Sequence, residues 1–271
     1  MFDRMTSLAL LLVLFVAVPC VAQENAAEKE SNWRLGAAIG YGERSNPLIQ
    51  SEDVPIVIDL DIAWFGEHWF FDNGDLGVTI VNNDAVTASV VARVNSDRVF
   101  FGKTDTRFVN IDLAGAPLAE ATDFKPPERD YAVELGLELL TDGDWGAMQM
   151  SAFHDVSGTH EGFELFANYS YGWRRQRLYI EPSVGASYKS ADLNNYYWGV
   201  TPEEAGLVAF PYEADAGINW HARLAFSYQL SRDWAISVVA EYDRLNDEAA
   251  ASPIVEEDNV LGWFAGFSRR F

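Results

Sequence analysis

From residue 33 onward, apolar and polar residues alternate one by one along many short segments of the chain. Leu35, Ala37 and Ile39, for example, fall on one side, with small or charged residues between them. Successive side chains of a β-strand point to opposite faces, so this period of two indicates strands. The segments that carry the pattern are 33–41, 56–64, 77–81, 86–94, 131–139, 145–153, 163–173, 178–188, 218–230, 234–242 and 263–271.

The last of these segments places its aromatic residues on one face. Trp263 and Phe267 share that face with Phe271, on which the sequence stops. A chain that ends in a strand on Phe is typical of the closing strand of an outer-membrane barrel. We therefore expect Trp263, Phe267 and Phe271 to lie on the strand that closes a barrel.

Charged residues occupy the second face of several segments. Asp59 and Asp61 alternate with large apolar residues, which suits a wet lumen better than a dry sandwich core. The two aspartates could form a cation site, but ion pairing with arginines of neighbouring strands is the interpretation that we favour. The charged residues expected to face the lumen are Asp59, Asp61, Glu134, Glu138, Glu164, Glu181 and Arg223.

Segment length and spacing favour a membrane-spanning barrel. Several segments run about ten residues, near the length that a tilted strand needs to cross the hydrocarbon. Long connections (190–214 and 246–258) alternate with short ones (174–177 and 231–233), as the external loops and periplasmic turns of such barrels do. We predict an all-β protein, a transmembrane antiparallel up-and-down β-barrel.

The strand count requires one adjustment. Eleven segments carry the pattern, whereas a single-chain barrel of this type has an even number of strands. A further strand could lie within 98–115, where 107–111 is the candidate, or two segments could form one strand. We favour about twelve strands, with ten as the alternative.

The first residues predict export. An uninterrupted apolar run from Leu8 to Val18 precedes the small residue Ala22, which matches a cleavable signal peptide and is too short for a spanning helix. We expect a signal peptide over 1–22, a polar, disordered leader over 23–32 and a single barrel domain over 33–271. Cleavage would remove Cys20, the chain's single cysteine.

Composition excludes several classes of protein. No apolar stretch after Ala22 approaches the length of a spanning helix, although 49% of the residues are apolar and 14% aromatic. The net charge of −22 argues against a basic patch for nucleic acid. No nucleotide fingerprint or phosphate-binding glycine loop is present, and we expect no cofactor.

Three clusters carry a family resemblance. The first is 154–162, with His154, Asp155, Ser157, Gly158, His160 and Gly162. The second is 195–201, with Tyr197, Trp198, Gly199 and Val200, and the third includes Ser252 and Pro253 ahead of the terminal strand. In this order and spacing they resemble the MltA-interacting protein (MipA)/OmpV family of Gram-negative outer-membrane proteins, over essentially the whole chain after the leader.

The resemblance implies a location in the outer membrane, in contact with its lipid, and a scaffold role. The family's named member links a lytic transglycosylase to a penicillin-binding protein, so the resemblance implies these two partners. The residues of the three clusters become candidate partner contacts or family-specific structural positions. The alternative function is a small outer-membrane channel for solutes or antibiotics.

The first cluster contains the residue types of a hydrolase triad, and a lipid-active enzyme is the third hypothesis. Triads are recognised by geometry rather than by closeness in sequence. Asp155 and Ser157 also fit a loop in which side chains cap backbone amides, which is the interpretation that we favour. The spacing of His154 and His160 matches no common zinc arrangement, so we expect neither catalytic nor metal-binding residues.

Overall fold

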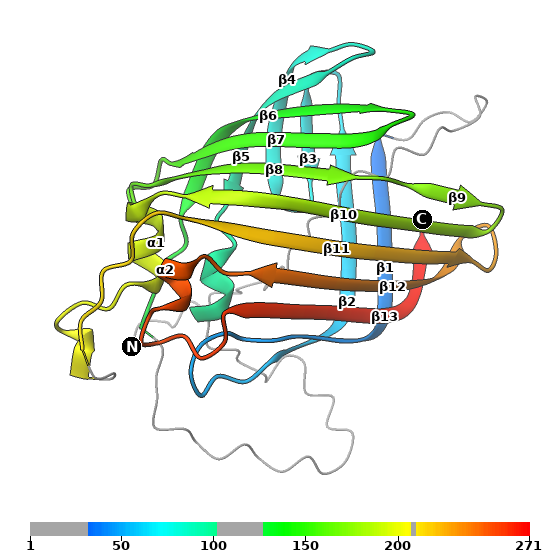
Figure 1. The fold of residues 1–271 in the computed structure, drawn as a ribbon. Coiled ribbons are helices and arrows are strands. Elements are labelled where there is room, and N and C mark those ends of the chain that lie inside the picture. Colours follow the sequence, from blue (N-terminus) through cyan, green and yellow to red (C-terminus); the bar gives the residue numbers. More distant parts are fainter. Residues whose placement is uncertain (1–31, 102–126, 207–209) are drawn as a thin grey trace, which may run out of the picture.

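The computed structural model describes residues 32–101, 127–206 and 210–271, and in them antiparallel strands close into a barrel (Figure 1). The expected signal peptide (1–22), most of the leader (23–31) and the candidate strand 107–111 lie outside these residues. The strands are β1 (Trp33–Arg44), β2 (Val54–Phe65), β3 (Trp69–Asp72), β4 (Asp75–Asn82), β5 (Thr87–Val94), β6 (Val133–Gly143), β7 (Gly146–Asp155), β8 (Phe163–Ser170), β9 (Trp173–Arg175), β10 (Leu178–Lys189), β11 (Gly217–Gln229), β12 (Trp234–Arg244) and β13 (Asn259–Arg270).

The barrel has twelve strands within the described residues, because β8 and β9 form one interrupted strand. Both pair with β10, β8 along its second half and β9 along its start. Between them the Tyr171 amide donates to the Pro182 carbonyl at 3.1 Å, so the ladder continues across the interruption. The predicted barrel of about twelve antiparallel strands is confirmed.

The strand that the sequence pattern lacked is β3. It lies between β2 and β4, whereas residues 97–101 form a short 3-10 helix, η1 (Asp97–Phe101). The barrel thus reaches twelve strands through β3, without the candidate 107–111, which lies outside the described residues. The four residues of β3 begin with three consecutive aromatics, so no alternation marks it.

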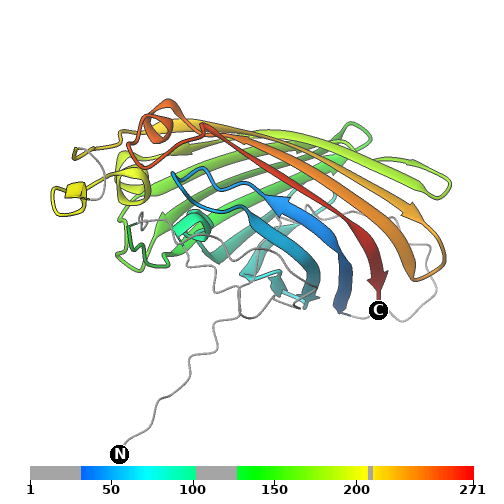
Figure 2. The ribbon, with the colours of Figure 1, turned by 90° about the horizontal axis from the view of Figure 1, so that it is seen from below.

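The two ends of the chain close the barrel. β13 pairs with β1, placing Phe267 opposite Ile39. The Phe271 amide donates to the Leu35 carbonyl at 2.8 Å, one residue beyond the last residue of β13. Figure 2 shows the first and last strands side by side along the sheet.

One face of each strand points outward and is apolar. Leu137, for example, is exposed while its neighbour Glu138 is half-buried on the lumen side. A register shift between Ile39 and Gly42 breaks this regularity in the β1–β2 pair. As a result Ile56, which simple alternation places beside Ile58, is buried (3% exposed) while Ile58 is 60% exposed.

Exposed aromatic side chains gather near both ends of the strands, as in the interfacial girdles of outer-membrane barrels. The ring at one end contains Trp33, Trp69, Trp145, Trp173, Tyr228 and Trp234. The ring at the other end contains Tyr41, Tyr131, Phe163, Tyr188, Tyr242 and Trp263. The apolar outer band between them fits the hydrocarbon of a bilayer.

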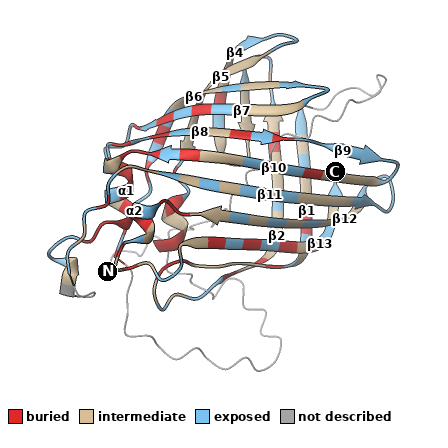
Figure 3. Ribbon diagram, in the orientation of Figure 1, coloured by how far each residue is buried: buried red, intermediate tan, exposed pale blue. Residues whose placement is uncertain are grey.

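The connections differ at the two ends of the barrel. One end, called here the turn end, carries the short turns 66–68, 83–86, 144–145, 176–177 and 230–233 together with Phe271. The other, the loop end, carries η1, α1 (Ala191–Trp198), η3 (Glu204–Gly206) and α2 (Asp247–Ala250). Buried residues concentrate around α1 and α2 (Figure 3). No helix among the described residues has the length and apolar character needed to cross a membrane.

Candidate functional site at the loop end

Side chains from several connections pack into one apolar cluster at the loop end, called here the loop-end core. The two largest, Tyr197 and Trp198 of α1, are fully buried. Phe101 of η1 lies against both rings, with centroids 6.0 and 5.6 Å away. The core consists of Leu48, Phe100, Phe101, Leu193, Tyr197, Trp198, Val200, Ala214, Leu245, Ala249, Ile254 and Val260. It covers the loop end of the barrel with packed side chains.

Helix caps hold α1 and α2 in this position. Ser190 caps the N-terminus of α1, and its hydroxyl also accepts a hydrogen bond from the Phe163 amide at 2.9 Å. Asn246 caps α2 by accepting from the Ala249 amide at 2.9 Å. Side chains of this kind satisfy helix amides that have no partner within the helix. An amide–amide hydrogen bond of 3.3 Å between Asn194 and Asn246 joins the two helices.

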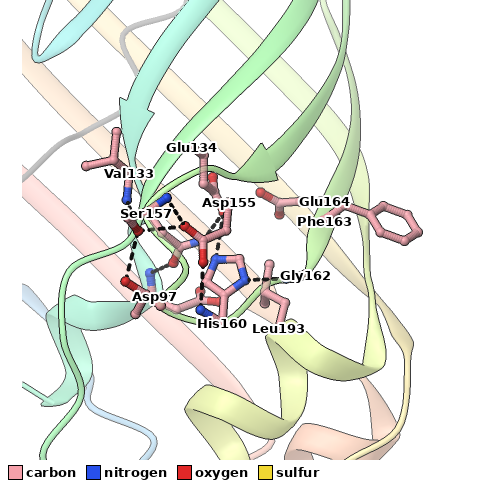
Figure 4. A network of polar contacts seen from close by, with 12 residues as sticks. Asp97, Val133, Glu134, Asp155, Ser157, His160, Gly162, Phe163, Glu164 and Leu193 are labelled. Carbon is pink, nitrogen blue, oxygen red and sulfur yellow. Dashed lines mark hydrogen bonds and ion pairs between the residues drawn. The ribbon is translucent and has the colours of Figure 1, made fainter.

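The first sequence cluster forms the loop between β7 and β8, and Asp155 organises it. Its carboxylate accepts from the Ser157 amide (2.8 Å), the Ser157 hydroxyl (2.6 Å), the His160 amide (2.7 Å) and the Glu161 amide (2.9 Å). Ser157 Oγ in turn accepts from the Val133 amide at 3.1 Å, which ties the loop to β6 (Figure 4). The predicted loop, in which Asp and Ser side chains cap amides, is confirmed.

The two glycines of this loop have different roles. Gly158 has a φ of +73°, in the left-handed region that glycine adopts without a steric penalty. Gly162 packs against the start of α1, where an added Cβ would lie 2.5 Å from Ser190 Oγ and 2.6 Å from the Leu193 amide nitrogen. A side chain at residue 162 would therefore push the loop away from α1.

A network of buried charges lies beneath this loop (Figure 4). His160 Nε2 is 3.2 Å from Glu134 Oε1, and both side chains are 0% exposed. Arg93 on β5 pairs with Glu134 at 2.8 Å and also with Glu164 on β8. Since β7 lies between β6 and β8 in the sheet, Arg93 reaches across the lumen to bridge these strands.

A second ion pair fastens η1 to the barrel wall. Lys189 Nζ lies 2.5 Å from Asp97 Oδ2, and both side chains are buried. Buried ionised groups have a large desolvation cost unless they are paired. The pair therefore fixes the position of η1, which supplies Phe100 and Phe101 to the loop-end core.

The second and third clusters meet at the end of α1. Ser252 Oγ donates to the Trp198 carbonyl at 2.5 Å, and Pro253 beside it is half-buried. The Val200 amide donates to the Tyr212 carbonyl at 2.8 Å, which forms an isolated bridge. Gly199 ends α1, and its amide donates to the Asn195 carbonyl. The structure thus brings all three clusters together at one end of the barrel.

Burial decides what these residues can touch. Tyr197 and Trp198 are fully enclosed, so their rings offer no surface on which a sugar or a peptide could stack. His154 is different, because it lies on the outward face of β7 and is exposed. Gly158 is exposed at the tip of its loop.

The geometry separates the residue types that suggested a hydrolase. His154 and Asp155 point to opposite faces of β7, and Ser157 Oγ donates to Asp155 rather than to a histidine. His154 and His160 also lie apart, one outside the barrel wall and the other beneath the loop. Across the described part of the chain, no group of three or more His, Cys, Asp or Glu side chains is placed to hold a metal ion.

The charged residues expected in the lumen form contacts across strands. Arg34 pairs with Asp61 at 3.1 Å, and Glu138 accepts from Gln149 Nε2 at 2.7 Å. Arg223 lies 3.9 Å from Glu181 and 3.1 Å from Glu241. Asp59, Asp61 and Arg223 also line a cavity of about 60 Å³ in the lumen.

Sequence reasoning missed several residues of this end. Arg129 donates to the Gly199 carbonyl at 2.9 Å and pairs with Glu204 at 2.6 Å, although no motif marks either residue. Asp97 lies in a short polar segment in which apolar and polar residues do not alternate. Asn246 could have been found, because Asn ahead of Asp247-Glu248 is a helix-start signal.

Comparison with known proteins gives consistent matches. Omp26La of Vibrio anguillarum is 30% identical over 140 residues (51% of this chain, 53% of the relative). OmpV of Vibrio cholerae serotype O1 is 31% identical over 175 residues (62% of this chain, 66% of the relative). The chain thus spans about half of the first relative and just under two thirds of the second. The MltA-interacting protein of Escherichia coli K12 is 23% identical over 250 residues (91% of this chain, 93% of the relative).

Omp26La and OmpV are both named as outer-membrane proteins. This agrees with the fold of the chain, which is a barrel of the outer-membrane type. The model of one protein family, described as MltA-interacting protein MipA, matches residues 35–271. That match includes the whole barrel except the first two residues of β1. The chain belongs to the MltA-interacting protein MipA family.

Proposed function

We propose that this barrel is a non-enzymatic scaffold that holds peptidoglycan enzymes at the outer membrane. Its partners would be a lytic transglycosylase and a penicillin-binding protein, docked at the turn end. In outer-membrane barrels the short turns face the periplasm, where both enzymes act. The Escherichia coli relative is called an MltA-interacting protein, and this name supports a partner of the first kind.

The observation that carries this proposal is the packing of the loop end. The loop-end core fills it with apolar side chains, and Arg93 and Arg223 hold ion pairs within the lumen. A barrel of twelve strands is wide enough to pass solutes only if its interior stays open. The packing therefore favours a binding role over the alternative of a solute channel.

The three sequence clusters have a structural role in this proposal. They lie at the loop end, opposite the turns that face the periplasm. Asp155, Gly162 and Trp198 hold loops and helices together through the contacts described above. Docked enzymes would then contact the turns, while the clusters keep the outer end closed.

The proposal also includes export and cleavage. A signal peptide over 1–22 would be removed, so that the mature chain starts at Gln23. N-terminal sequencing of protein purified from outer membranes tests this step. A chain that begins at Met1 would contradict it.

The test of the scaffold is a tagged pull-down from detergent-solubilised outer membranes. Heat-modifiable gel migration first establishes that the barrel is folded. We expect near-stoichiometric recovery of a lytic transglycosylase or a penicillin-binding protein. Recovery of the barrel alone, together with open events in planar bilayers, would contradict the scaffold and favour the channel.

A further inference from the structure

Six arginines lie on one side of the turn end, a region called here the arginine sector. They come from β9 and the turn that follows it, from the β11–β12 turn and from the end of β13, and all six are exposed. They are Arg174, Arg175, Arg177, Arg232, Arg269 and Arg270. The chain as a whole carries a net charge of −22, so this stretch departs strongly from its average.

Backbone hydrogen bonds make the sector continuous. The Arg177 carbonyl accepts from the Gln229 amide at 2.8 Å, and the Asp233 carbonyl accepts from the Arg270 amide at 3.0 Å. The Gln229 side chain donates to the Arg232 carbonyl at 3.4 Å. Neighbouring strands lie about 4.8 Å apart, so the four intervals from β9 to β13 span about 19 Å of rim. The patch that one partner contributes to a small protein interface has a comparable width.

The arginines of the sector differ from those of the lumen. Arg34, Arg93 and Arg223 each pair with a carboxylate in the lumen. None of the six sector arginines forms an ion pair within the part of the chain that the structure describes. The turns 176–177 and 230–233 contain one acidic residue, Asp233. Their positive charge is therefore available to a partner.

Aromatic rings position two of these guanidinium groups. Arg174 lies over the ring of Tyr179, 5.0 Å from its centroid. Arg269 lies 5.5 Å from the Trp234 centroid and 4.8 Å from that of Phe271. Such contacts orient a cation without neutralising it. They also reduce the side-chain entropy that binding would cost.

The rest of the turn end has the opposite charge. The β2–β3, β4–β5 and β6–β7 connections carry Glu67, Asp84 and Asp144, and Asp142 lies at the end of β6, so the described part of the rim is divided into a basic and an acidic side. Lipid headgroups surround a barrel evenly, and binding to them does not require such a division. A protein that docks from one side gains specificity and a faster association from such a division.

We propose that the arginine sector is the surface on which the turn end docks a periplasmic protein, through an acidic patch of that partner. The inference rests on the proposed scaffold function and names the surface that it uses. Arginine suits this task because its planar guanidinium binds carboxylates through two parallel hydrogen bonds. Complementary charge also speeds association and sets the orientation of the partner.

Photocrosslinking in living cells tests the sector without assuming which protein binds. A benzophenone amino acid replaces Gln176, between Arg175 and Arg177, or replaces Asp144 on the acidic side. Both residues are exposed in short turns. We expect a protein adduct from residue 176 and none from residue 144. Gel migration of the unheated protein checks that each variant is folded.

Charge removal then tests whether the arginines hold the partner. The variant Arg175→Gln, Arg177→Gln, Arg232→Gln should lower the yield of the adduct about tenfold, since three surface ion pairs are lost. The matched control Asp84→Asn, Asp142→Asn, Asp144→Asn alters the same number of charges on the acidic side. It should leave the adduct from residue 176 unchanged.

The outcomes separate this inference from the scaffold proposal. An arginine-dependent adduct with a protein other than a cell-wall enzyme supports the sector and contradicts the scaffold proposal. Recovery of a cell-wall enzyme by pull-down, with an adduct that the three substitutions leave unchanged, keeps the scaffold and overturns the sector. Lipid adducts alone at residue 176, or equal protein adducts at both residues, also overturn the sector.

Discussion

His160 Nε2 lies 3.2 Å from Glu134 Oε1, with both side chains removed from solvent. The second ring nitrogen, Nδ1, accepts a hydrogen bond from the Gly162 amide at 3.0 Å. A neutral ring with its hydrogen on Nε2 satisfies both contacts. The imidazole therefore ties the β7–β8 loop to the charged network of the lumen.

The variant His160→Ala should destabilise the barrel by about 2 kcal/mol, because a buried hydrogen bond to a charged group is lost. Glu134 would keep its contacts with Arg93 and Asn95, which limits the loss. Urea unfolding of the protein in lipid vesicles, followed by tryptophan fluorescence, measures the change in the free energy of unfolding.

The strand that leads into this loop, β7, supplies the control. His154→Ala removes an exposed imidazole from the outward face of β7 and should change the free energy of unfolding by less than about 0.5 kcal/mol. An equal decrease in the free energy of unfolding for His160→Ala and His154→Ala would contradict the stabilising role of the His160–Glu134 contact. Unchanged growth of cells that carry His154→Ala and Ser157→Ala would also remove the hypothesis of a lipid-active enzyme.

Arg93 is the centre of the second prediction, because it pairs with both Glu134 and Glu164. Arg93→Met should lower the free energy of unfolding by about 3–5 kcal/mol, since it leaves two buried carboxylates without their cation. Adding Glu164→Gln should recover part of this loss, because neighbouring residues are not additive. The same urea titration measures both variants.

Arg174→Met is the matched control for that pair of variants. Arg174 is exposed in the arginine sector. Among the residues that the structure describes, no carboxylate forms an ion pair with it. Its replacement should leave the free energy of unfolding within about 0.5 kcal/mol. Strictly additive effects of Arg93→Met and Glu164→Gln would show that Arg93 does not hold the two carboxylates together.

The fold could be predicted from the sequence because a barrel wall repeats one local rule. Lipid on one side and a polar lumen on the other impose a period of two on every long strand. β3 broke the rule because its four residues include three aromatics in a row. Ile56 broke it because the register shift opposite Gly42 turns its side chain toward the lumen.

The loop end could not be derived in this way. Leu48, Phe101 and Ile254 belong to one buried cluster there, although they come from connections far apart in the sequence. A regular alternation of apolar and polar residues cannot identify such contacts. The resemblance identified the three clusters but assigned them no position in space. Asp155 was the exception, because a local capping loop can be recognised within a few residues.

Trp198 leads to the third prediction, which concerns the loop-end core. Its ring is fully buried and lies 5.6 Å from Phe101 and 6.0 Å from Phe100. Trp198→Ala should destabilise the protein by about 3–5 kcal/mol, through lost burial and the cavity left behind. Limited proteolysis of the folded barrel should then cut at the loop end and leave the strands intact.

Trp198→Phe serves as the conservative comparison, since it keeps an aromatic ring beside Phe100 and Phe101. It should retain most of the stability and of the protease resistance. New cleavage at the turn end, or equal sensitivity of the two variants, would contradict a local role for this core.

The last prediction concerns Glu204, whose carboxylate lies 2.6 Å from Arg129 Nη1. Burial tends to raise the pKa of Glu204, but hydrogen bonds from Arg129 and from the Thr201 amide outweigh it and hold the pKa below its usual value of 4.5. A pKa that is lower in the folded state contributes stability above the unfolded value, and this contribution is lost as the pH falls through the folded value. The urea midpoint of the wild type should therefore exceed that of Glu204→Gln at pH 7, and the difference should shrink as the pH falls below about 4.5. Glu203→Gln removes the same charge from an exposed neighbour, so a matching pH dependence in that variant would show that net charge, rather than the contact with Arg129, is responsible.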